Sequence, residues 1–455
     1  MTTPTSARAA APNPCTDARE ASEAYDSLVD ARSGIVARTW PEQLPTFGPP
    51  GLRICLAQLS PTDRFAAPLG SDTTAGCAWW DDDAARRAAI GEAVEWYCAS
   101  LVPADLPLVS AEEIAPTERV NIADLALYRP EQTAAPGFPF RAFTGDVRVR
   151  WVTGHHLDGQ PCQVPASLVY LGYGSGPTAN ETLTNLPVNA GVAAALEPAA
   201  ALSAALAEVV ERDALAEAWT FGQPLVPLTI PDALHAQLAA DDQTTWRFYR
   251  LPSSVEVAAV LAVVHRPCDA VFGVGAAVRG DGEAAARKAA AEAMVAASGC
   301  IEINRADSRQ CARLIDDGGP LSPWRADRRY RDSYRADWRD AVDIACHAQL
   351  YVDPEMQHRA LDRLDTLAGV RRPEPLLALP ALELSTLPDL LHERGFSPIV
   401  CDVTTPDVAS LGWHVRRAVV PGLRATGPAA FPYLGETARS RTHDLPLHLE
   451  PVPHV

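Results

Sequence analysis

Two parts of the chain carry the same pair of acidic residues at the spacing of a helical turn. Glu92 and Glu95 stand three residues apart, and Glu208 and Glu211 repeat that spacing later in the sequence. Side chains three residues apart lie on one face of an α-helix, so each pair offers two carboxylates in one direction. Two converging pairs repel each other unless a cation neutralises them, and carboxylate oxygens are the ligands that Mg²⁺ prefers. The spacing therefore indicates a divalent-metal site shared by two helices.

An acidic pair on a helix is more commonly a solvated surface face, and the neighbouring residues decide between the two alternatives. Apolar residues extend well beyond one stripe of both expected helices, namely Ile90, Ala93, Val94, Tyr97, Leu206, Val209, Val210 and Leu215. Helices that are apolar almost all round are buried. We therefore expect both helices in the interior of the protein, with Asp81, Asp82 and Asp83 at the positive N-terminus of the first.

Length and composition are those of a globular protein and exclude several classes of function. The 455 residues suffice for two or three ordinary domains or one large one, and 47% are hydrophobic. The formal net charge of −18 argues against a nucleic-acid partner, because such binding needs a basic face that neutralises phosphates. Lys288 is the only lysine, so no Gly-Lys-Ser/Thr triplet exists and a P-loop is excluded.

No segment predicts secretion or a membrane helix. Residues 1–14 lack an apolar core, so we expect a loose, disordered tail there and no signal peptide. The longest apolar run, near 255–264, is far shorter than the roughly 18 to 20 residues of a membrane helix. The ten cysteines form no CxxC pair, which favours free thiols in a cytosolic protein over disulfides or zinc. We therefore expect a cytoplasmic protein with no membrane partner.

Helical and strand patterns alternate along the chain, which predicts an α+β fold of mixed sheets and helices. Besides the two acidic helices, we expect helices over 18–29 and 282–297. Strands are expected at 34–37, 52–59, 147–153, 167–173, 255–264, 270–278, 398–403 and 415–421. The glycines Gly273 and Gly275 begin no complete GxGxxG pattern, which excludes a dinucleotide site there.

Two later segments are interpreted from their composition. Residues 305–340 are dense in Arg and Asp, and we interpret them as a solvent-facing helix with many ion pairs rather than as a phosphate site. A proline-rich link over 373–380 precedes a small α/β end portion and a long irregular tail.

Taken in order, these segments resemble the YcaO family of ATP-dependent enzymes that modify peptide backbones. The resemblance extends from about residue 30 to the last residue. Its pieces are Ala89–Glu95, Gly191–Ala194 with the second acidic pair, Gly273–Ala277 with Ala289–Ala293, Val419–Leu423 with Tyr433–Gly435, and Pro451–Val455. The resemblance implies a tail and first helix over residues 1–30 and a single large YcaO-like domain over residues 31–455.

The resemblance also implies the cofactors and the residues of the site. ATP and Mg²⁺ are the implied cofactors, and five carboxylates are implied metal ligands: Glu92, Glu95, Glu208, Glu211 and Glu292. Asn189, Gly191 and Arg212 are implied contacts of ATP. Pro451 and Pro453, in the proline-rich C-terminal tail, are implied in catalysis, as in relatives that cyclise peptides.

The activity implied by the resemblance is azoline formation on a ribosomally made precursor peptide. A Cys, Ser or Thr side chain of the peptide attacks the preceding backbone carbonyl. The resulting oxygen is phosphorylated, and loss of phosphate leaves a thiazoline or oxazoline ring. The chain shows no module for binding a leader peptide, which implies a ThiF-like or other leader-binding partner. A second YcaO protein and pairing as a homodimer are further implied partnerships.

Four positions depart from the family pattern. Ala88 and Trp96 replace the usual Ser and Arg around the first acidic pair, Ala190 changes the second segment, and Val295 stands near the usual Gln of the third. The Trp96 replacement removes a bidentate phosphate donor. Three alternatives therefore stay open: an active cyclodehydratase, a degenerate non-catalytic scaffold, and an enzyme that forms thioamides or amidines. The retained carboxylates favour activity, and the proline-rich ending favours cyclodehydration.

Overall fold

The computed structural model describes residues 22–62, 72–238, 241–308, 312, 315, 319–440 and 445–454. These residues form mixed sheets and helices, which confirms the expected α+β class. The loose tail expected over residues 1–14 lies outside the described residues. Of the helix expected over 18–29, residues 22–26 are helical. They pack on the rest of the fold, because the ring of Tyr25 meets that of Trp413 edge-on at 4.7 Å.

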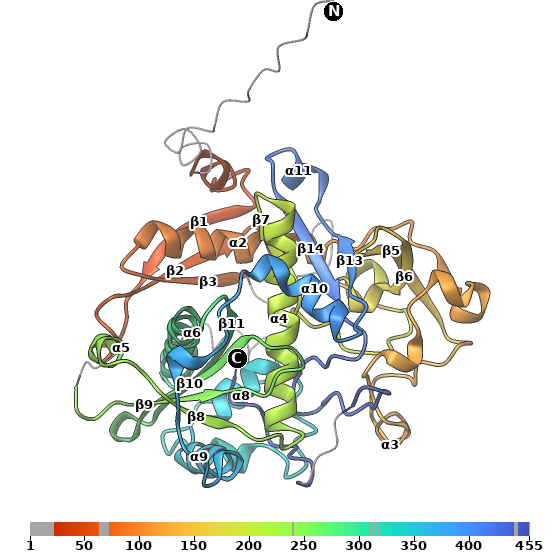
Figure 1. Cartoon of the computed structure of the whole chain (residues 1–455). Coiled ribbons are helices and arrows are strands. Elements are labelled where there is room, and N and C mark those ends of the chain that lie inside the picture. Colours follow the sequence, from red (N-terminus) through yellow and green to blue (C-terminus); the bar gives the residue numbers. More distant parts are fainter. Residues whose placement is uncertain are drawn as a thin grey trace, which may run out of the picture.

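The N-terminal part is an antiparallel sheet of three strands covered by one helix (Figure 1). Its strands are β1 (Val36–Glu42), β2 (Leu52–Leu59) and β3 (Thr73–Trp79), and the helix is α2 (Asp82–Ser100). Asp81 caps α2 by accepting a hydrogen bond from the backbone N–H of Ala84 at 2.8 Å. The helix lies close against β3 because Gly76 has no side chain there; a Cβ would come within 2.1 Å of the backbone nitrogen of Ala89.

A second sheet has six strands, and two of them come from the end of the chain. The order is β4-β5-β13-β14-β7, with β6 paired to β5. The strands are β4 (Leu108–Ser110), β5 (Arg148–His156), β6 (Pro161–Pro165), β7 (Val192–Ala195), β13 (Ile399–Asp402) and β14 (His414–Val419). The expected small α/β end portion is therefore corrected, because β13 and β14 lie inside this sheet.

The third sheet has five strands in the order β11-β10-β9-β8-β12. They are β8 (Val226–Thr229), β9 (Thr245–Arg250), β10 (Ala258–Arg266), β11 (Val271–Arg279) and β12 (Glu374–Pro375). Helix α6 (Gly282–Ile303) lies against β11. The glycines Gly273 and Gly275 allow this contact, since a Cβ on either would come within 2.2 Å of a backbone oxygen of α6. Their role is close packing, which agrees with the rejected dinucleotide interpretation.

Helix α4 (Pro198–Trp219) runs through the middle of the molecule between the sheets (Figure 1). Alanines at contact positions let α4 pack closely against β7, β11 and β14. The remaining helices are α3 (Pro130–Thr133), α5 (Asp232–Leu238), α8 (Ile344–Leu350), α9 (Pro354–Ala368), α10 (Leu387–Glu393) and α11 (Pro406–Ala409). Helices α2, α4 and α6 thus converge from three parts of the sequence.

Two predictions of local structure were wrong. The strand expected over 167–173 is a 3₁₀ helix, Ala166–Leu168, followed by turns. Ser167 donates its hydroxyl to Asn185 at 2.6 Å, and such side-chain bonds compete with a strand ladder. Among the described residues of 305–340, 312 and 315 are helical as expected, but from 319 onward the structure has only one short 3₁₀ helix, Tyr330–Ser333. The expected ion pairs are present, but most join residues two apart, such as Arg325 and Asp327 at 2.8 Å, a spacing that does not face one side of a helix.

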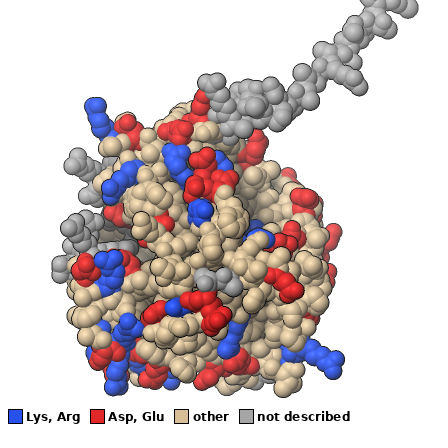
Figure 2. Space-filling view, turned by 90° about the vertical axis from the view of Figure 1, so that its left-hand side faces the viewer, with Lys and Arg blue, Asp and Glu red and all other residues tan. Residues whose placement is uncertain are grey.

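The surface carries charges of both signs, and the described cysteines are the free thiols that the sequence predicts. Acidic and basic side chains of the described residues intermingle on the face in Figure 2, with wide uncharged areas between them. All cysteines among the described residues are free thiols. None of the helices in the described ranges is long and apolar enough to span a bilayer.

Candidate functional site

Five carboxylates from three helices gather at one place in the fold. Glu92 and Glu95 come from α2, Glu208 and Glu211 from α4, and Glu292 from α6. Each of these charges acts on others in the group: Glu208 raises the pKa of both Glu92 and Glu95, and Glu292 raises that of Glu211. The structure therefore brings together all five side chains that the sequence analysis singled out. We call these five residues the acidic cluster.

Four members of the acidic cluster are held in place by backbone N–H groups at strands. Glu92 accepts from Ala75 at 3.2 Å and Glu95 from Ala194 at 2.9 Å. Glu208 accepts from the N–H of Gly191 at 2.9 Å. Glu211 accepts from the N–H of Val278 in β11 at 3.2 Å. Each of these bonds uses one carboxylate oxygen, and the second oxygens of Glu208 and Glu211 face Arg212.

The protein raises the pKa values of three of these carboxyl groups. Burial is the largest cause for Glu92, whose pKa rises from 4.5 to about 7, although the nearby Lys288 opposes the rise. Burial and the charge of Glu208 raise the pKa of Glu95 well above its usual value. Burial and Glu292 together raise the pKa of Glu211 to about 8. A cation placed among these groups would favour their ionised forms and lower these pKa values again.

Two basic residues stand inside the acidic cluster. Lys288, one helical turn before Glu292, lies 3.0 Å from that carboxylate. Arg212 lies 3.5 Å from Glu208 and 3.8 Å from Glu211. They offset part of the negative charge of the five carboxylates, and both can donate to phosphate oxygens.

A small cavity of about 80 Å³ adjoins this cluster, and Arg212 and Arg417 both line it. Arg417 comes from β14 and is 4% exposed. One of its amino groups donates to the carbonyl of Val188 at 2.8 Å, whereas its Nε is buried without a hydrogen-bond partner. Burial lowers the pKa of Arg417 to about 10, so the side chain stays charged at neutral pH. An unpartnered charged donor beside a cavity is a site for an anionic oxygen.

The sequence analysis missed Arg417. The available signal was weak: Arg417 is one of two adjacent arginines in β14, two residues before the Val-Val-Pro-Gly segment that follows Ala418. Buried arginines are uncommon unless they have a partner or a ligand.

The backbone before the second acidic pair positions Asn189 and Gly191 next to Arg417 and Glu208. Gly191 has a φ of +90°, and a Cβ there would come within 2.8 Å of the carbonyl oxygen of Ala418. Only glycine satisfies both conditions easily, and this geometry aims its N–H at Glu208. Asn189 accepts from Arg417 through its carbonyl, and its side-chain oxygen is buried without a partner.

Trp96, which stands where the family pattern has Arg, projects from α2 among apolar residues. Its ring is partly buried against the core that contains Trp151 and Val192, and its Nε1–H has no partner. The other altered positions, Ala88, Ala190 and Val295, carry no hydrogen-bonding side chain. Of these, Ala190 lines the cavity of Arg212 and Arg417.

The C-terminal tail enters the acidic cluster through His454 rather than through its prolines. The carbonyl of Pro451 accepts a hydrogen bond from Tyr351 at 2.6 Å, and Pro453 is buried. His454 is 7% exposed and lies within 2.8 Å of the guanidinium of Arg212. Burial, aided by Arg212, lowers the pKa of this imidazole well below 6.5. The prolines shape the path of the tail, and His454 is the residue that sequence reasoning missed.

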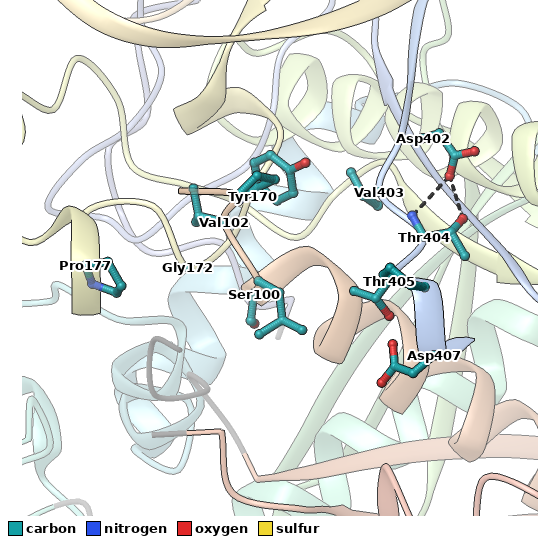
Figure 3. Close-up of a pocket in the computed structure, with 13 residues that line it drawn as sticks. Ser100, Val102, Tyr170, Gly172, Pro177, Asp402, Val403, Thr404, Thr405 and Asp407 are labelled. Carbon is teal, nitrogen blue, oxygen red and sulfur yellow. Dashed lines mark hydrogen bonds between the residues drawn. The ribbon is translucent and has the colours of Figure 1, made fainter. Parts of the chain in front are cut away.

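A larger hollow of about 490 Å³ lies at the end of α2, away from the acidic cluster (Figure 3). Its two carboxylates are already engaged. Asp402 accepts from the N–H and hydroxyl of Thr404, and Asp407 accepts from the hydroxyl of Tyr97 at 2.8 Å. The hollow brings together two carboxylates, whereas the acidic cluster brings together five from three helices, so the acidic cluster is the better candidate for chemistry.

Sequence comparison identifies a family for most of the chain. A family model described as YcaO cyclodehydratase, ATP- and Mg²⁺-binding, matches residues 80–424. The matched range contains all five carboxylates and Arg417, and it ends before the tail. Comparison with curated proteins gives no match.

Three solved structures have a similar fold. The first is a heterocyclase in complex with substrate and cofactor, with a TM-score of 0.65 and 15% identity over 90% of this chain and 52% of that one. The second is YcaO from Methanopyrus kandleri bound with AMPPCP and Mg²⁺. Its TM-score is 0.52, with 20% identity over 85% of this chain and 86% of that one. The third is the E. coli microcin synthetase McbBCD complex. Its TM-score is 0.50, with 13% identity over 86% of this chain and 88% of that one. At these identities the likeness shows the fold, and this chain spans about half the length of the first structure.

Proposed function

The chain belongs to the YcaO cyclodehydratase family, whose cofactors are ATP and Mg²⁺, and from this premise we propose that it is an ATP-dependent subunit that forms azolines on a ribosomally made precursor peptide. Its substrates are Cys, Ser or Thr residues of that peptide, which become thiazolines or oxazolines. For each ring the peptide loses one water, whose oxygen leaves as part of phosphate, and one ATP is consumed.

The observation that carries the proposal is the acidic cluster with its anchored carboxylates. Buried like charges are destabilising unless a cation compensates them. Oxygen ligands from five carboxylates suit Mg²⁺, and the unpartnered Nε of Arg417 suits a phosphate oxygen. The residues present therefore fit both cofactors of the family.

Each part of the site has a role in this proposal. The carboxylates of Glu92, Glu95, Glu208, Glu211 and Glu292 would hold Mg²⁺, and Arg212, Lys288 and Arg417 would bind phosphate oxygens. When bound, ATP and Mg²⁺ would supply the phosphoryl group that makes the peptide oxygen a leaving group. Leu125, Leu127 and Pro421 line the cavity of Arg417 and would limit access of water to the reacting oxygen.

The chain requires partners in this proposal. One relative in fold, the E. coli microcin synthetase, is an McbBCD complex. We propose that a separate ThiF-like or other leader-binding protein delivers the precursor peptide to this chain. A second YcaO protein and a homodimer of this chain are further partners suggested by the family resemblance.

The proposal is tested by ATP turnover in the presence of the partner and the peptide. Wild-type protein is expected to produce ADP only when all components are present. Arg212→Ala should abolish this turnover, because it removes the guanidinium closest to Glu208 and Glu211. Absence of ADP in every combination of wild-type components would overturn the proposal.

A second candidate function is a non-catalytic YcaO scaffold, and Trp96 is the observation that favours it. Trp cannot offer the fork of donors that the family's Arg offers to phosphate. In a scaffold, Trp96→Arg alone would not restore turnover, because Ala88, Ala190 and Val295 would still depart from the family pattern. Arg417 weakens this alternative, since it provides another guanidinium next to the acidic cluster.

A further inference from the structure

The segment that carries His454 into the acidic cluster is fixed at several points. The carbonyl of Glu450 accepts from the indole N–H of Trp219 at 2.9 Å. His347 binds the carbonyl of Val452 at 3.0 Å, and His454 itself forms a backbone bridge to Val274 of β11. These anchors come from α4, α8 and β11, so the position of the imidazole is determined by the fold.

The imidazole lies beside two members of the acidic cluster. One ligand atom each from Glu211, Glu292 and His454 lies within 4.8 Å of the other two. The Nε2 of His454 is 4.0 Å from an oxygen of Glu292. Ligands about 2.1 Å from an ion are separated from each other by about 3 to 4 Å, so only a small closure would complete such a site. The three residues come from α4, α6 and the tail.

A cationic group of the protein already stands between these ligands. Arg212 contacts both ring nitrogens of His454, at 2.8 and 2.9 Å, and lies 3.8 Å from Glu211. A guanidinium has donors but no lone pair, so it cannot share His454 with a metal ion. Binding of an ion would turn Arg212 away from His454 and free its donors for another acceptor.

We propose that Glu211, Glu292 and His454 form a mixed nitrogen and oxygen site for a first-row transition ion such as Co²⁺, Mn²⁺ or Zn²⁺. Imidazole is a good ligand for such ions, whereas Mg²⁺ prefers oxygen ligands alone. At Glu211 and Glu292 the transition ion would take the place of Mg²⁺, whereas Glu92, Glu95 and Glu208 offer oxygen ligands alone, which suits Mg²⁺. The acidic cluster thus has two unlike metal positions, and the tail supplies the nitrogen that distinguishes them.

The site overlaps that of the proposed function, but the test of it needs neither peptide nor turnover. The probes are Co²⁺ and Mg²⁺ alone, titrated into the full chain by calorimetry and, for Co²⁺, by visible absorption. We expect Co²⁺ to bind at least tenfold more tightly than Mg²⁺. His454→Ala should weaken Co²⁺ binding at least tenfold and leave Mg²⁺ binding nearly unchanged. His358→Ala, at an exposed histidine of α9, is the control and should change neither.

A second measurement separates ligation from anchoring of the tail. Electron spin echo spectroscopy of bound Mn²⁺ should show coupling to one imidazole nitrogen, lost in His454→Ala and in His454→Asn. Tyr351→Phe, which loosens the tail at Pro451 but retains the imidazole, should keep the coupling. No nitrogen coupling in the wild type, or equal Co²⁺ affinity in wild type and His454→Ala, would overturn the inference. Ring formation without nitrogen coupling would refute the inference alone, whereas coupling without ring formation would refute the proposed function alone.

Discussion

At the scale of the residue, the site is built from carboxylates that backbone N–H groups hold in place. Glu211 gives one oxygen to the N–H of Val278, and Glu208 gives one to that of Gly191. Backbone donors fix these carboxylates without neutralising them. In the described part of the chain, only two cationic side chains, Arg212 and Lys288, pair with the five carboxylates of the acidic cluster, so negative charge remains for a cation.

Replacement of Glu211 by Gln should impair cofactor binding more than folding. The amide oxygen can still accept from Val278, while one negative charge and one ligand are lost. We expect affinity for Mg²⁺-AMPPCP to fall roughly tenfold or more. The melting temperature should stay level or rise, because repulsion by Glu292 is relieved. Calorimetry measures the first effect and thermal denaturation the second.

Glu283→Gln is the matched control for that experiment. Glu283 lies in the first turn of α6, where it pairs with Arg287 at 2.9 Å, outside the acidic cluster. Its replacement should leave the affinity for Mg²⁺-AMPPCP unchanged. Equal affinity of Glu211→Gln and wild type would show that Glu211 holds no cofactor.

Arg417→Gln should also weaken nucleotide binding. A charge-assisted hydrogen bond contributes about 1.5 to 3 kcal/mol, so we expect affinity for Mg²⁺-AMPPCP to fall about tenfold to hundredfold. Arg416→Gln is the control, because Arg416 is the next residue on β14 and pairs with Asp402 instead. Calorimetry that gives the same affinity for both variants would remove Arg417 from the phosphate site.

At the scale of the element, the site depends on how closely α2, α4 and α6 approach the strands. Gly76 in β3 removes a side chain that would hold α2 away, Gly273 and Gly275 in β11 do so for α6, and Gly191 does so for α4. The N–H of Ala75, next to Gly76, can then reach Glu92, and the N–H of Gly191 itself reaches Glu208. Close packing and ligand placement therefore have the same origin.

Gly275→Ala tests this link. Its Cβ would lie 2.2 Å from the carbonyl oxygen of Ala289, so α6 must shift. We expect a loss of about 1 to 3 kcal/mol in the free energy of unfolding, as for other overpacked cores. Gly299→Ala, on α6 itself, is the control, because a Cβ there meets nothing within 4 Å. This variant should raise the free energy of unfolding by about 0.5 to 1 kcal/mol. Denaturant unfolding that ranks both variants equally would contradict this account.

The elements show how far sequence reasoning reaches. Strand β2 (Leu52–Leu59) matches its predicted range, and the predicted strands at β10 and β11 are shifted by a few residues at most. The strand predicted at 167–173 failed because a short apolar run has the same pattern in a buried turn. The helix expected over 305–340 is absent from residue 319 onward, because Arg and Asp two residues apart satisfy each other in a loop as well as near a helix.

The same limits apply to the site. The glutamate pairs were predictable because helical spacing places both side chains on one face. Arg417 and His454 were not found, since each reaches the site through tertiary structure. The position of Arg417 depends on β14 pairing with β7, and that of His454 depends on a tail held by α4, α8 and β11. Neither arrangement can be recognised from the spacing of neighbouring residues in the sequence.

At the scale of the whole molecule, the acidic cluster should make the stability of the metal-free protein depend on pH. Glu92 and Glu211 have folded pKa values of about 7 and about 8, above the usual 4.5. Between about pH 4.5 and pH 8 the folded state therefore binds more protons than the unfolded state, and the free energy of unfolding falls as pH rises.

Thermal denaturation in EDTA checks this expectation. The melting temperature should decrease by a few degrees from about pH 6 to about pH 8, and Mg²⁺ should reduce the decrease by favouring the ionised carboxylates. The double variant Glu92→Gln, Glu211→Gln should show a flatter profile over the same range. A melting temperature that rises with pH in EDTA would contradict the raised pKa values.

The central claim is that this chain forms rings on a peptide at the expense of ATP. The most direct measurement is mass spectrometry of the precursor peptide after incubation with this protein, the leader-binding partner, ATP and Mg²⁺. The account predicts a peptide lighter by one water for each converted Cys, Ser or Thr, with one ADP formed per ring. A peptide of unchanged mass, with no ADP formed, would contradict it and favour the scaffold.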